Sequence, residues 1–338
     1  MSRDADVLVV GGGPVGLAAA IEARLAGLSV VVLEPREGPV DKACGEGLMP
    51  GALPLLERLG VDPEGAPLVG VSYRSRGVVA DHRFEGGPGR GVRRTVLHAA
   101  LADRARALGV SLVTCRAEGI AQDASGVTAG GLRADWLLAA DGLHSPARRA
   151  LGLERPGPTG QRRFGIRQHF EVAPWNDHIE VHWTRDAEVY VTPLGPDLVG
   201  VAVLGVQGAD IEAAIASTVG ERLRDARPLS DRRGAGPFGQ RAARVQLGRV
   251  LLVGDASGYV DAITGEGLRL GFEQARVAVA ALTGGRPYER EWRRVTRPFR
   301  VLTRGLVGAA SSPLRGGIVP LAARAPRLYG AVVERLAR

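Results

Sequence analysis

The chain has 338 residues, 45% of them hydrophobic and 24% charged, with two cysteines and a formal net charge of +8. This length predicts one large α/β unit or roughly two domains with a buried core. Two cysteines exclude a disulfide framework, and we expect no metal site. No apolar run approaches the ~20 residues that span a bilayer, and the polar start carries no signal peptide. We therefore expect a cytoplasmic protein without stable membrane insertion, with only peripheral membrane contact left open.

The basic residues are almost all arginine, because Lys42 is the single lysine. The arginines are spread along the chain and interleaved with acids, as in ERLRDARPLSDRR at 221–233. A phosphate-binding surface would gather them on one patch or helix. We therefore expect a small-molecule partner and no nucleic acid.

The first motif begins with the apolar, β-branched run DVLVV at 6–10, which is typical of a buried parallel strand. The segment 11–27, GGGPVGLAAAIEARLAG, follows with the spacing Gly11-x-Gly13-x-x-Gly16 and helical periodicity. A second apolar run, LSVVVLE at 28–34, ends in an acid. This order predicts a βαβ unit that holds a pyrophosphate at the helix N-terminus. The unit alone fits either NAD or FAD.

Two later segments repeat the strand–turn–helix pattern. Residues 136–149 read WLLAADGLHSPARR, and 249–275 read RVLLVGDASGYVDAITGEGLRLGFEQA. With the first motif, in this order, they resemble the FAD-dependent monooxygenases of the p-hydroxybenzoate hydroxylase superfamily, and most closely its geranylgeranyl-reductase-like branch. The resemblance covers at least residues 6–275.

The resemblance implies an α/β fold with a Rossmann-type FAD-binding domain, an inserted, mainly antiparallel β-sheet domain for the substrate, and C-terminal helices. The expected FAD-binding ranges are 1–69, 90–157 and 240–285. The substrate domain is expected at 70–89 and 158–239, where strand patterns are dense, and the helical segment at 286–338.

Residue by residue, the resemblance implies FAD contacts from the phosphate turn, the ribose acid and the later motifs. These are Gly11, Gly13, Pro14, Val15, Gly16, Glu34, Cys44, Gly45, Gly47, Arg94, Ala117, Asp141, Gly142, Gly254, Asp255, Gly265, Gly267 and Leu268. A helix that starts near Gly267 would direct its N–H dipoles at the negative charge of the reduced ring.

In the substrate domain, strand alternation places His178, Glu180 and His182 on one face of HIEVHW. That face is predicted either to line the cavity or to face solvent. Candidate substrate contacts are His169, His182, Tyr190 and Thr192, and candidate catalytic residues are Cys44, His182 and Tyr190. Thr192 stands where the reductase branch often has Trp, which favours a polar or phenolic substrate over a long lipid.

The leading hypothesis is a monooxygenase in which NAD(P)H reduces FAD and a flavin C4a-hydroperoxide, formed with O2, hydroxylates a small aromatic or polyketide-like substrate. The alternative is a flavin-dependent reductase of isoprenoid C=C bonds, favoured by KACGEGL at 42–48. A flavoprotein scaffold without turnover is a third hypothesis. The tetrapeptide Gly-Glu-Gly-Leu occurs at both 45–48 and 265–268, and we expect both copies to bring backbone close to the flavin ring.

Overall fold

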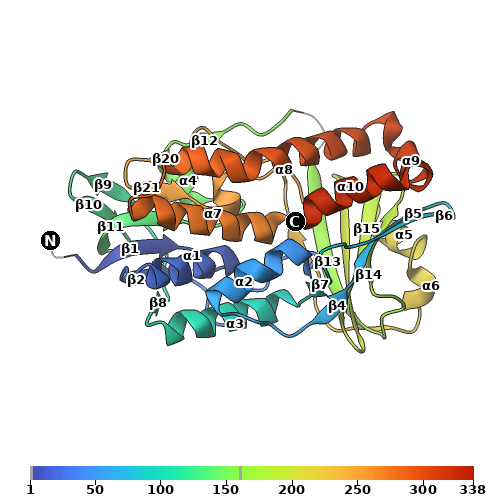
Figure 1. Ribbon diagram of the computed structural model, residues 1–338, viewed down its shortest axis with the longest axis horizontal. Helices are drawn as coiled ribbons and strands as arrows, with labels where there is room; N and C mark the ends of the chain where they lie inside the picture. The colour runs from blue at the N-terminus through green and yellow to red at the C-terminus, as the bar shows by residue number, and fades with distance from the viewer. Residues whose placement is uncertain (1–2, 160–161) are drawn as a thin grey trace.

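Two large β-sheets lie end to end in this computed structural model, with long helices running beside them (Figure 1). The structure describes residues 3–159 and 162–338. One sheet belongs to the N-terminal dinucleotide motif, and the other is built mainly from the middle of the chain. The α/β architecture predicted from the sequence is confirmed.

The first sheet has the order β20-β21-β11-β1-β2-β8, with β10 and β9 added to β11 as an antiparallel extension. Its strands are β1 (Ala5–Val10), β2 (Val30–Leu33), β8 (Ser111–Val113), β9 (Ala121–Asp123), β10 (Gly126–Ala129), β11 (Leu132–Ala139), β20 (Gln246–Leu247) and β21 (Val250–Leu252). The pairs β1–β2, β1–β11, β2–β8 and β11–β21 are parallel. With α1 (Pro14–Leu25) between β1 and β2, the predicted βαβ unit is confirmed.

Both faces of this sheet are covered, which explains why β1 reads as a continuous apolar run. Val7 and Val9 pack in one cluster with α1, α3 (Arg94–Ala107) and α7 (Gly267–Leu282). Leu8 and Val10 pack in another cluster with β10, β11 and α4 (Pro146–Ala150). The buried sheet thus fixes the turn that follows β1 between two layers.

The second sheet has the order β17-β13-β16-β15-β14-β5-β6, with β18 also paired to β13. Its strands are β5 (Gly70–Ser75), β6 (Val78–Arg83), β13 (Arg163–Glu171), β14 (His178–Trp183), β15 (Ala187–Gly195), β16 (Leu198–Val206), β17 (Arg227–Pro228) and β18 (Arg233–Ala235). Only the β14–β5 pair is parallel among the described strands of this sheet. The predicted, mainly antiparallel sheet from two separate segments is therefore present.

Smaller elements connect the two sheets. They are β3 (Gly47–Leu48), η1 (Pro50–Ala52), α2 (Leu53–Leu59), β4 (Ala66–Leu68), β7 (Gly89–Gly91), β12 (Glu154–Arg155), α5 (Ile211–Ala216), α6 (Gly220–Leu223), β19 (Arg241–Ala242) and η2 (Gly254–Ser257). The strands β3, β7 and β4 form a sheet of their own. The predicted domain boundaries follow the division between the large sheets and remain a proposal.

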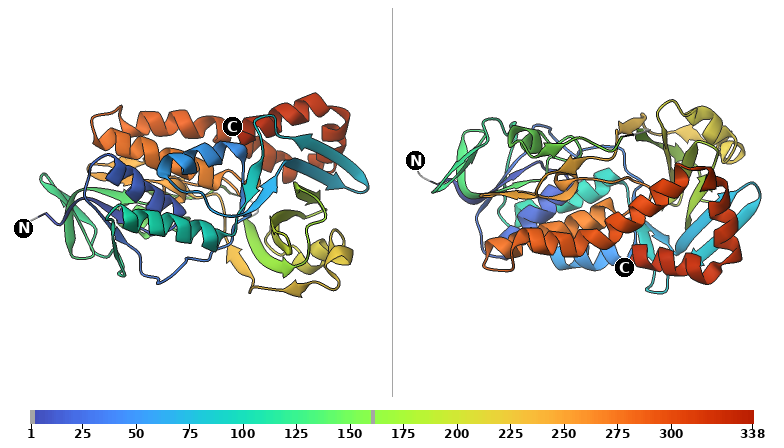
Figure 2. Two further views of the ribbon diagram at one scale, coloured as in Figure 1. Left: turned by 60° about the horizontal axis from the view of Figure 1, so that its bottom comes forward. Right: turned by 90° about the horizontal axis from the view of Figure 1, so that it is seen from above.

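The C-terminal segment is helical, as predicted, with α8 (Tyr288–Ala310), η3 (Pro313–Gly317), α9 (Ile318–Arg324) and α10 (Pro326–Ala337). Figure 2 shows these helices as a layer along one side of the molecule. Arg315 pairs with the buried Glu188 of β15 and so ties this layer to the second sheet. Among the helices in the described ranges, none is long and apolar enough to cross a membrane.

Candidate functional site

A single cavity of about 510 Å³ lies between the two sheets and contains most of the residues that the motifs predicted. It is lined by the turn after β1, the loop 41–47, the turn after β11, the segment 253–268 and one face of the second sheet. The inner side of α10 contributes Val333 and Leu336. Three motifs that are far apart in sequence therefore meet in one place.

The turn after β1 brings bare backbone to the cavity. Gly11 has φ of 99°, and a Cβ at this position would lie 2.6 Å from the carbonyl oxygen of Ala140. A Cβ at Gly16 would lie 1.8 Å from the Gly11 oxygen, so close packing of α1 on the turn requires glycine there. Because α1 starts at Pro14, its unpaired N–H groups and positive dipole end face the cavity.

Glu34 closes this turn from the end of β2. Its Oε2 accepts a hydrogen bond from the amide of Gly12 at 2.9 Å, and Arg36 donates to both carboxylate oxygens. Burial alone would raise the pKa of Glu34, but the bonds from Arg36 and Gly12 hold that pKa below its ordinary value. The residue is therefore an ionised acceptor at the cavity rim.

Two cations reach the same region without a carboxylate partner within salt-bridge distance among the described residues. Lys42, the only lysine of the chain, lines the cavity, and burial together with Arg36 and Arg94 lowers the pKa of its amine. The guanidinium of Arg94 lies near Gly13, and its buried Nε has no hydrogen-bond partner. Neighbouring like charges with unused donors are stabilised by an anion placed between them.

Two half-buried aspartates follow the other sheet strands. Asp141, after β11, accepts from the amide of Ala147 at the start of α4, while its Oδ1 is buried without a partner among the described residues. Asp255, after β21, lies near Arg94 and Lys42. Burial raises the pKa of both carboxyl groups. Both retain acceptor atoms directed at the cavity region that the phosphate turn also faces.

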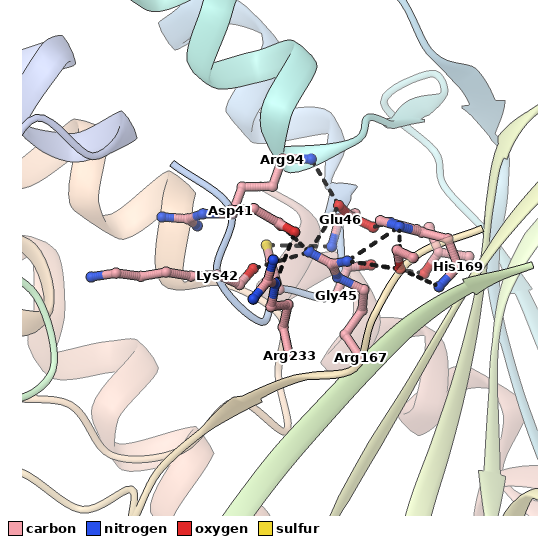
Figure 3. Close-up of polar contacts among 11 residues, drawn as sticks. Asp41, Lys42, Gly45, Glu46, Arg94, Arg167, His169 and Arg233 are labelled. Atoms are coloured by element: carbon pink, nitrogen blue, oxygen red, sulfur yellow. Dashed lines mark hydrogen bonds and ion pairs between the residues drawn. The ribbon is translucent and has the colours of Figure 1, made fainter. Parts of the chain in front are cut away.

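The loop 41–47 is fixed to its surroundings by Glu46, whose φ is 59° (Figure 3). The carboxyl group of Glu46 accepts from the amide of Arg94 at 2.8 Å and lies 2.6 Å from Nε2 of His169. Arg167 contacts the same loop through Asp41, which also binds Arg233. These contacts hold Cys44 and Gly45 at the cavity wall, where the amide of Glu46 donates to the Cys44 sulfur at 3.4 Å.

The second Gly-Glu-Gly-Leu copy faces the loop 41–47 across the cavity. Gly265 has φ of 70°, Glu266 precedes the first residue of α7, and Gly267 begins that helix, as predicted. Burial raises the pKa of Glu266 to about 7, although Arg269 pairs with it at 2.5 Å. Gly267 and Leu268 line the cavity, so the N-terminus of α7 is directed into it.

The part of the cavity under the second sheet is mainly apolar. Its lining includes Met49, Val71, Tyr73, Ile166, Ile179, Val181, Tyr190, Ala202, Leu204, Phe238 and Ile263. The side chains come from alternate positions of β14, β15 and β16, as strand geometry requires. A ligand in this half would be recognised chiefly by shape and apolar contact.

Comparison with known proteins identifies the first half of this site. The model of the family described as "FAD binding domain" matches residues 4–284. The chain belongs to this family. It is 28% identical to menaquinone reductase of Mycolicibacterium smegmatis, over 84% of this chain and 78% of that protein. It is 30% identical to 12-dehydrotetracycline 5-monooxygenase/anhydrotetracycline 6-monooxygenase of Streptomyces rimosus, over 80% and 61%.

A solved flavoprotein structure has the same fold. A flavoprotein/dehydrogenase from Cytophaga hutchinsonii superposes with a TM-score of 0.85 at 20% identity, covering 98% of this chain and 92% of that one. The protein is therefore an FAD-dependent enzyme of the monooxygenase and reductase superfamily, and the resemblance seen in the sequence is confirmed.

The residues present fit FAD. The glycine turn leaves room for a diphosphate that a Cβ would remove, and Lys42 and Arg94 supply unpaired positive charge beside it. Glu34 and the unpartnered oxygen of Asp141 offer acceptors for hydroxyl groups. We propose that these residues hold the cofactor, with Gly45, Gly265 and Gly267 along its ring.

Most of the predicted FAD residues line the cavity, with three exceptions. Gly16 packs behind the turn, and Gly254 lies in a smaller hollow beside α7. Ala117 instead packs with the cluster between β10 and β11. The cavity does not include Ala117, so the FAD contact that the resemblance implies there stays a prediction.

The predicted substrate residues need correction. His182 does not line the cavity: Ile179 and Val181 face it, so alternation turns His182 to the opposite side of β14, where it binds Glu180 at 2.8 Å. Of the two alternatives left open for this polar face, the geometry of β14 does not support the one in which the face lines the cavity. His169 is buried beneath the loop and contacts Glu46 rather than the cavity.

Tyr190 and Thr192 do line the cavity, but their hydroxyl groups are already used. The phenol of Tyr190 donates to the carbonyl of Ile263 at 2.9 Å, and burial raises its pKa well above the ordinary value. Thr192 donates to the carbonyl of Gly45 at 2.9 Å. Both side chains thus position loops of the cavity wall, at Ile263 and at Gly45, and the polarity of Thr192 does not indicate a polar substrate.

Sequence reasoning missed several cavity residues, namely Arg36, Lys42, Glu46, Tyr73, Arg167 and Tyr259. Lys42 carried a signal, because a lone lysine in an arginine-rich chain is unusual. Glu46 also carried a signal, because it lies in the repeated Gly-Glu-Gly-Leu. Arg36, Tyr73, Arg167 and Tyr259 carried none, since no local pattern places them at the cavity.

Proposed function

We propose that this FAD-dependent enzyme uses NAD(P)H to reduce a C=C bond of a largely apolar, prenyl-type substrate. The observation that carries the proposal is Cys44, a thiol at the cavity wall between the cofactor side and the apolar side. Burial raises the pKa of Cys44, although Arg94 acts in the opposite direction. A thiol that stays protonated at neutral pH is suited to donate a proton to carbon.

Bound FAD would supply hydride-transfer chemistry toward one carbon of the double bond, with NAD(P)H as the source of the electrons. The thiol of Cys44 then supplies the proton for the other carbon and recovers it from water. The buried site disfavours the Cys44 thiolate, so return of the proton to the sulfur is favourable. The positive charge of Arg94 limits the energy of the transient thiolate during the step. The apolar wall from Ile179 and Val181 would orient the chain of the substrate and exclude water.

The name of one relative supports this choice, since menaquinone reductase matches 84% of this chain. Since Thr192 and Tyr190 use their hydroxyl groups within the protein, the polar contacts expected for a phenolic substrate are fewer than the sequence indicated.

Hydroxylation of a polyketide-like substrate with O2 is the second candidate. It is supported by the 30% identity to the tetracycline enzyme and by Tyr73 and Tyr259, which line the cavity. For neither phenol does the structure record a side-chain hydrogen bond within the described ranges. They could bind oxygen atoms of such a substrate.

The two candidates differ in their need for Cys44 and for O2. We would measure anaerobic NADPH oxidation with prenyl acceptors, and O2 uptake with polyketide phenols, for the wild type, Cys44→Ser and Cys115→Ser. Cys115 is the matched control, a half-buried thiol outside the cavity. Reduction that falls about a hundredfold in Cys44→Ser alone supports the proposal. Substrate-stimulated O2 uptake that survives Cys44→Ser would establish the second candidate instead.

A further inference from the structure

The net positive charge of the protein comes from its C-terminal segment, although arginines occur along the whole chain. Residues 286–338 contain twelve arginines and three glutamates, a net charge of +9. Residues 1–285 contain 32 basic and 33 acidic residues, a net charge of −1. The whole excess of +8 therefore resides in the segment that forms α8, η3, α9 and α10.

The outer side of α8 gathers these charges into a stripe. Arg290, Arg294, Arg297, Val301 and Arg304 are all exposed, and helical geometry places them within an arc of roughly 80°. Arg290, Arg297 and Arg304 make no ion pair with any residue in the described ranges. Their guanidinium groups are therefore available to an anion outside the protein.

Large aliphatic side chains in the same layer of helices are exposed to solvent. Leu314, Leu321 and Leu328 are 72%, 59% and 58% exposed, and Val301 is 60% exposed. The four exposed large hydrophobic side chains elsewhere in the described chain are all at 45% or below. The most exposed apolar groups thus coincide with the most basic segment.

This layer has its inner side occupied and its outer side free. The right-hand view of Figure 2 shows α8, α9 and α10 together along one side. On the inner side, Val333 and Leu336 of α10 line the cavity. On the outer side of α10, Arg327, Leu328 and Arg335 are exposed.

We propose that the outer face of α8, η3, α9 and α10 docks on the surface of an anionic phospholipid bilayer. Arginine side chains bind lipid phosphates, while leucines inserted at the level of the acyl chains add apolar burial. A nucleic acid would use the arginines but leave the leucines in water. A second copy would bring two arginine-rich faces together, which repel each other. The proposal does not depend on which reaction the enzyme catalyses.

The first test is flotation of the FAD-loaded protein with vesicles of phosphatidylcholine alone or of equal parts phosphatidylcholine and phosphatidylglycerol. We expect binding to the anionic vesicles only, and release at ~0.5 M salt, where charges are screened over about 4 Å. Equal binding to both vesicles, or no binding to either, would overturn the proposal. Tighter binding to duplex DNA than to anionic vesicles would assign the face to nucleic acid.

The second test changes the net charge by the same amount at two different places on the protein. Arg290→Glu/Arg297→Glu/Arg304→Glu should weaken binding to anionic vesicles by about tenfold or more. The control Arg155→Glu/Arg224→Glu/Arg244→Glu changes net charge equally at exposed arginines outside this segment, and should bind as the wild type does. Leu321→Ser/Leu328→Ser should also weaken binding. Bound FAD, measured by absorbance, verifies folding, and equal losses in both triple variants would refute a specific face.

Discussion

The two copies of Gly-Glu-Gly-Leu have the same sequence but take different backbone conformations. In the first copy the glutamate is left-handed, with Glu46 at φ 59°, and Gly47 begins β3. In the second copy the preceding glycine is left-handed, with Gly265 at φ 70°, and Gly267 begins α7. The difference shows that the surroundings, and not the four residues, select the conformation.

The two glutamates also differ in how their carboxyl groups are satisfied. Both are buried, at 3% and 2% exposure. Glu46 is bound by the amide of Arg94 and by His169, on two other elements. Glu266 is bound by Arg269 of its own helix, and its Oε1 has no partner. We therefore expect Glu46 to anchor the site and Glu266 to respond to pH.

The largest effect is expected at the anchor. Glu46→Ala leaves the buried His169 and the Arg94 amide without an acceptor, and should lower the free energy of unfolding by about 3 kcal/mol. Glu46→Gly should cost about 1 kcal/mol less, since it relieves the left-handed strain. Urea unfolding measures both. The exposed Glu37→Ala is the control, and a loss in Glu46→Ala no greater than in this control would refute the anchor.

A comparable effect at Glu266 should depend on pH. The folded pKa of about 7 lies above the ordinary glutamate pKa of 4.5, so the stability that this group contributes is complete below pH 4.5 and is lost as the pH rises through 7. Relative to Glu266→Gln, the wild type should lose roughly 3 kcal/mol across that range. Unfolding curves between those pH values measure the difference. A difference that does not change with pH would contradict the raised pKa.

Substitutions of the glycines that follow the glutamates should change the free energy of unfolding by less than the substitutions of the glutamates. A Cβ at Gly47 would lie 2.9 Å from Cδ1 of Ile179, whereas the nearest atom to a Cβ at Gly267 is 3.6 Å away. Gly47→Ala should therefore cost about 1–2 kcal/mol from overpacking. Gly267→Ala should be neutral or stabilise by up to ~1 kcal/mol through helix propensity. Thermal unfolding of the two variants compares them directly, and the reverse order would show that Ile179 moves freely.

The smallest effect is expected at the glycines that precede the glutamates. Gly265→Ala should cost about 1 kcal/mol, because alanine must adopt the left-handed conformation there. Gly45 has no positive φ and no atom within 4 Å of a Cβ, so Gly45→Ala should stay within about 0.5 kcal/mol. Chemical unfolding distinguishes them, and equal costs would indicate that the two copies are conformationally alike.

Local patterns explain which parts of the fold were predictable. The run DVLVV with its glycine turn specified β1, α1 and β2, because strand burial, turn geometry and helix N-terminus are all short-range properties. The strand patterns at 163–206 likewise predicted the second sheet. In the site, the same local logic found Gly13, whereas Asp141 and Gly267 came from the resemblance to the family.

The orientation of the second sheet was not predictable in this way. Alternation divided β14 into a polar and an apolar face, but it could not say which face meets the cavity. The structure turns Ile179 and Val181 inward, so His182 lies on the other side. That choice depends on how the sheet packs against the cofactor domain, which is a contact between residues far apart in the chain.

The sequence by itself determined the dinucleotide turn, the family and the presence of two sheets, because each depends on residues within one turn or strand. Only the tertiary structure decided that Thr192 and Tyr190 fix loops, that Glu46 joins His169 to Arg94, and that Lys42 faces the cavity. The hydrogen bonds among these contacts join residues that lie 48 to 147 positions apart in the chain. Their formation requires the whole chain to fold, since neither partner signals the other locally.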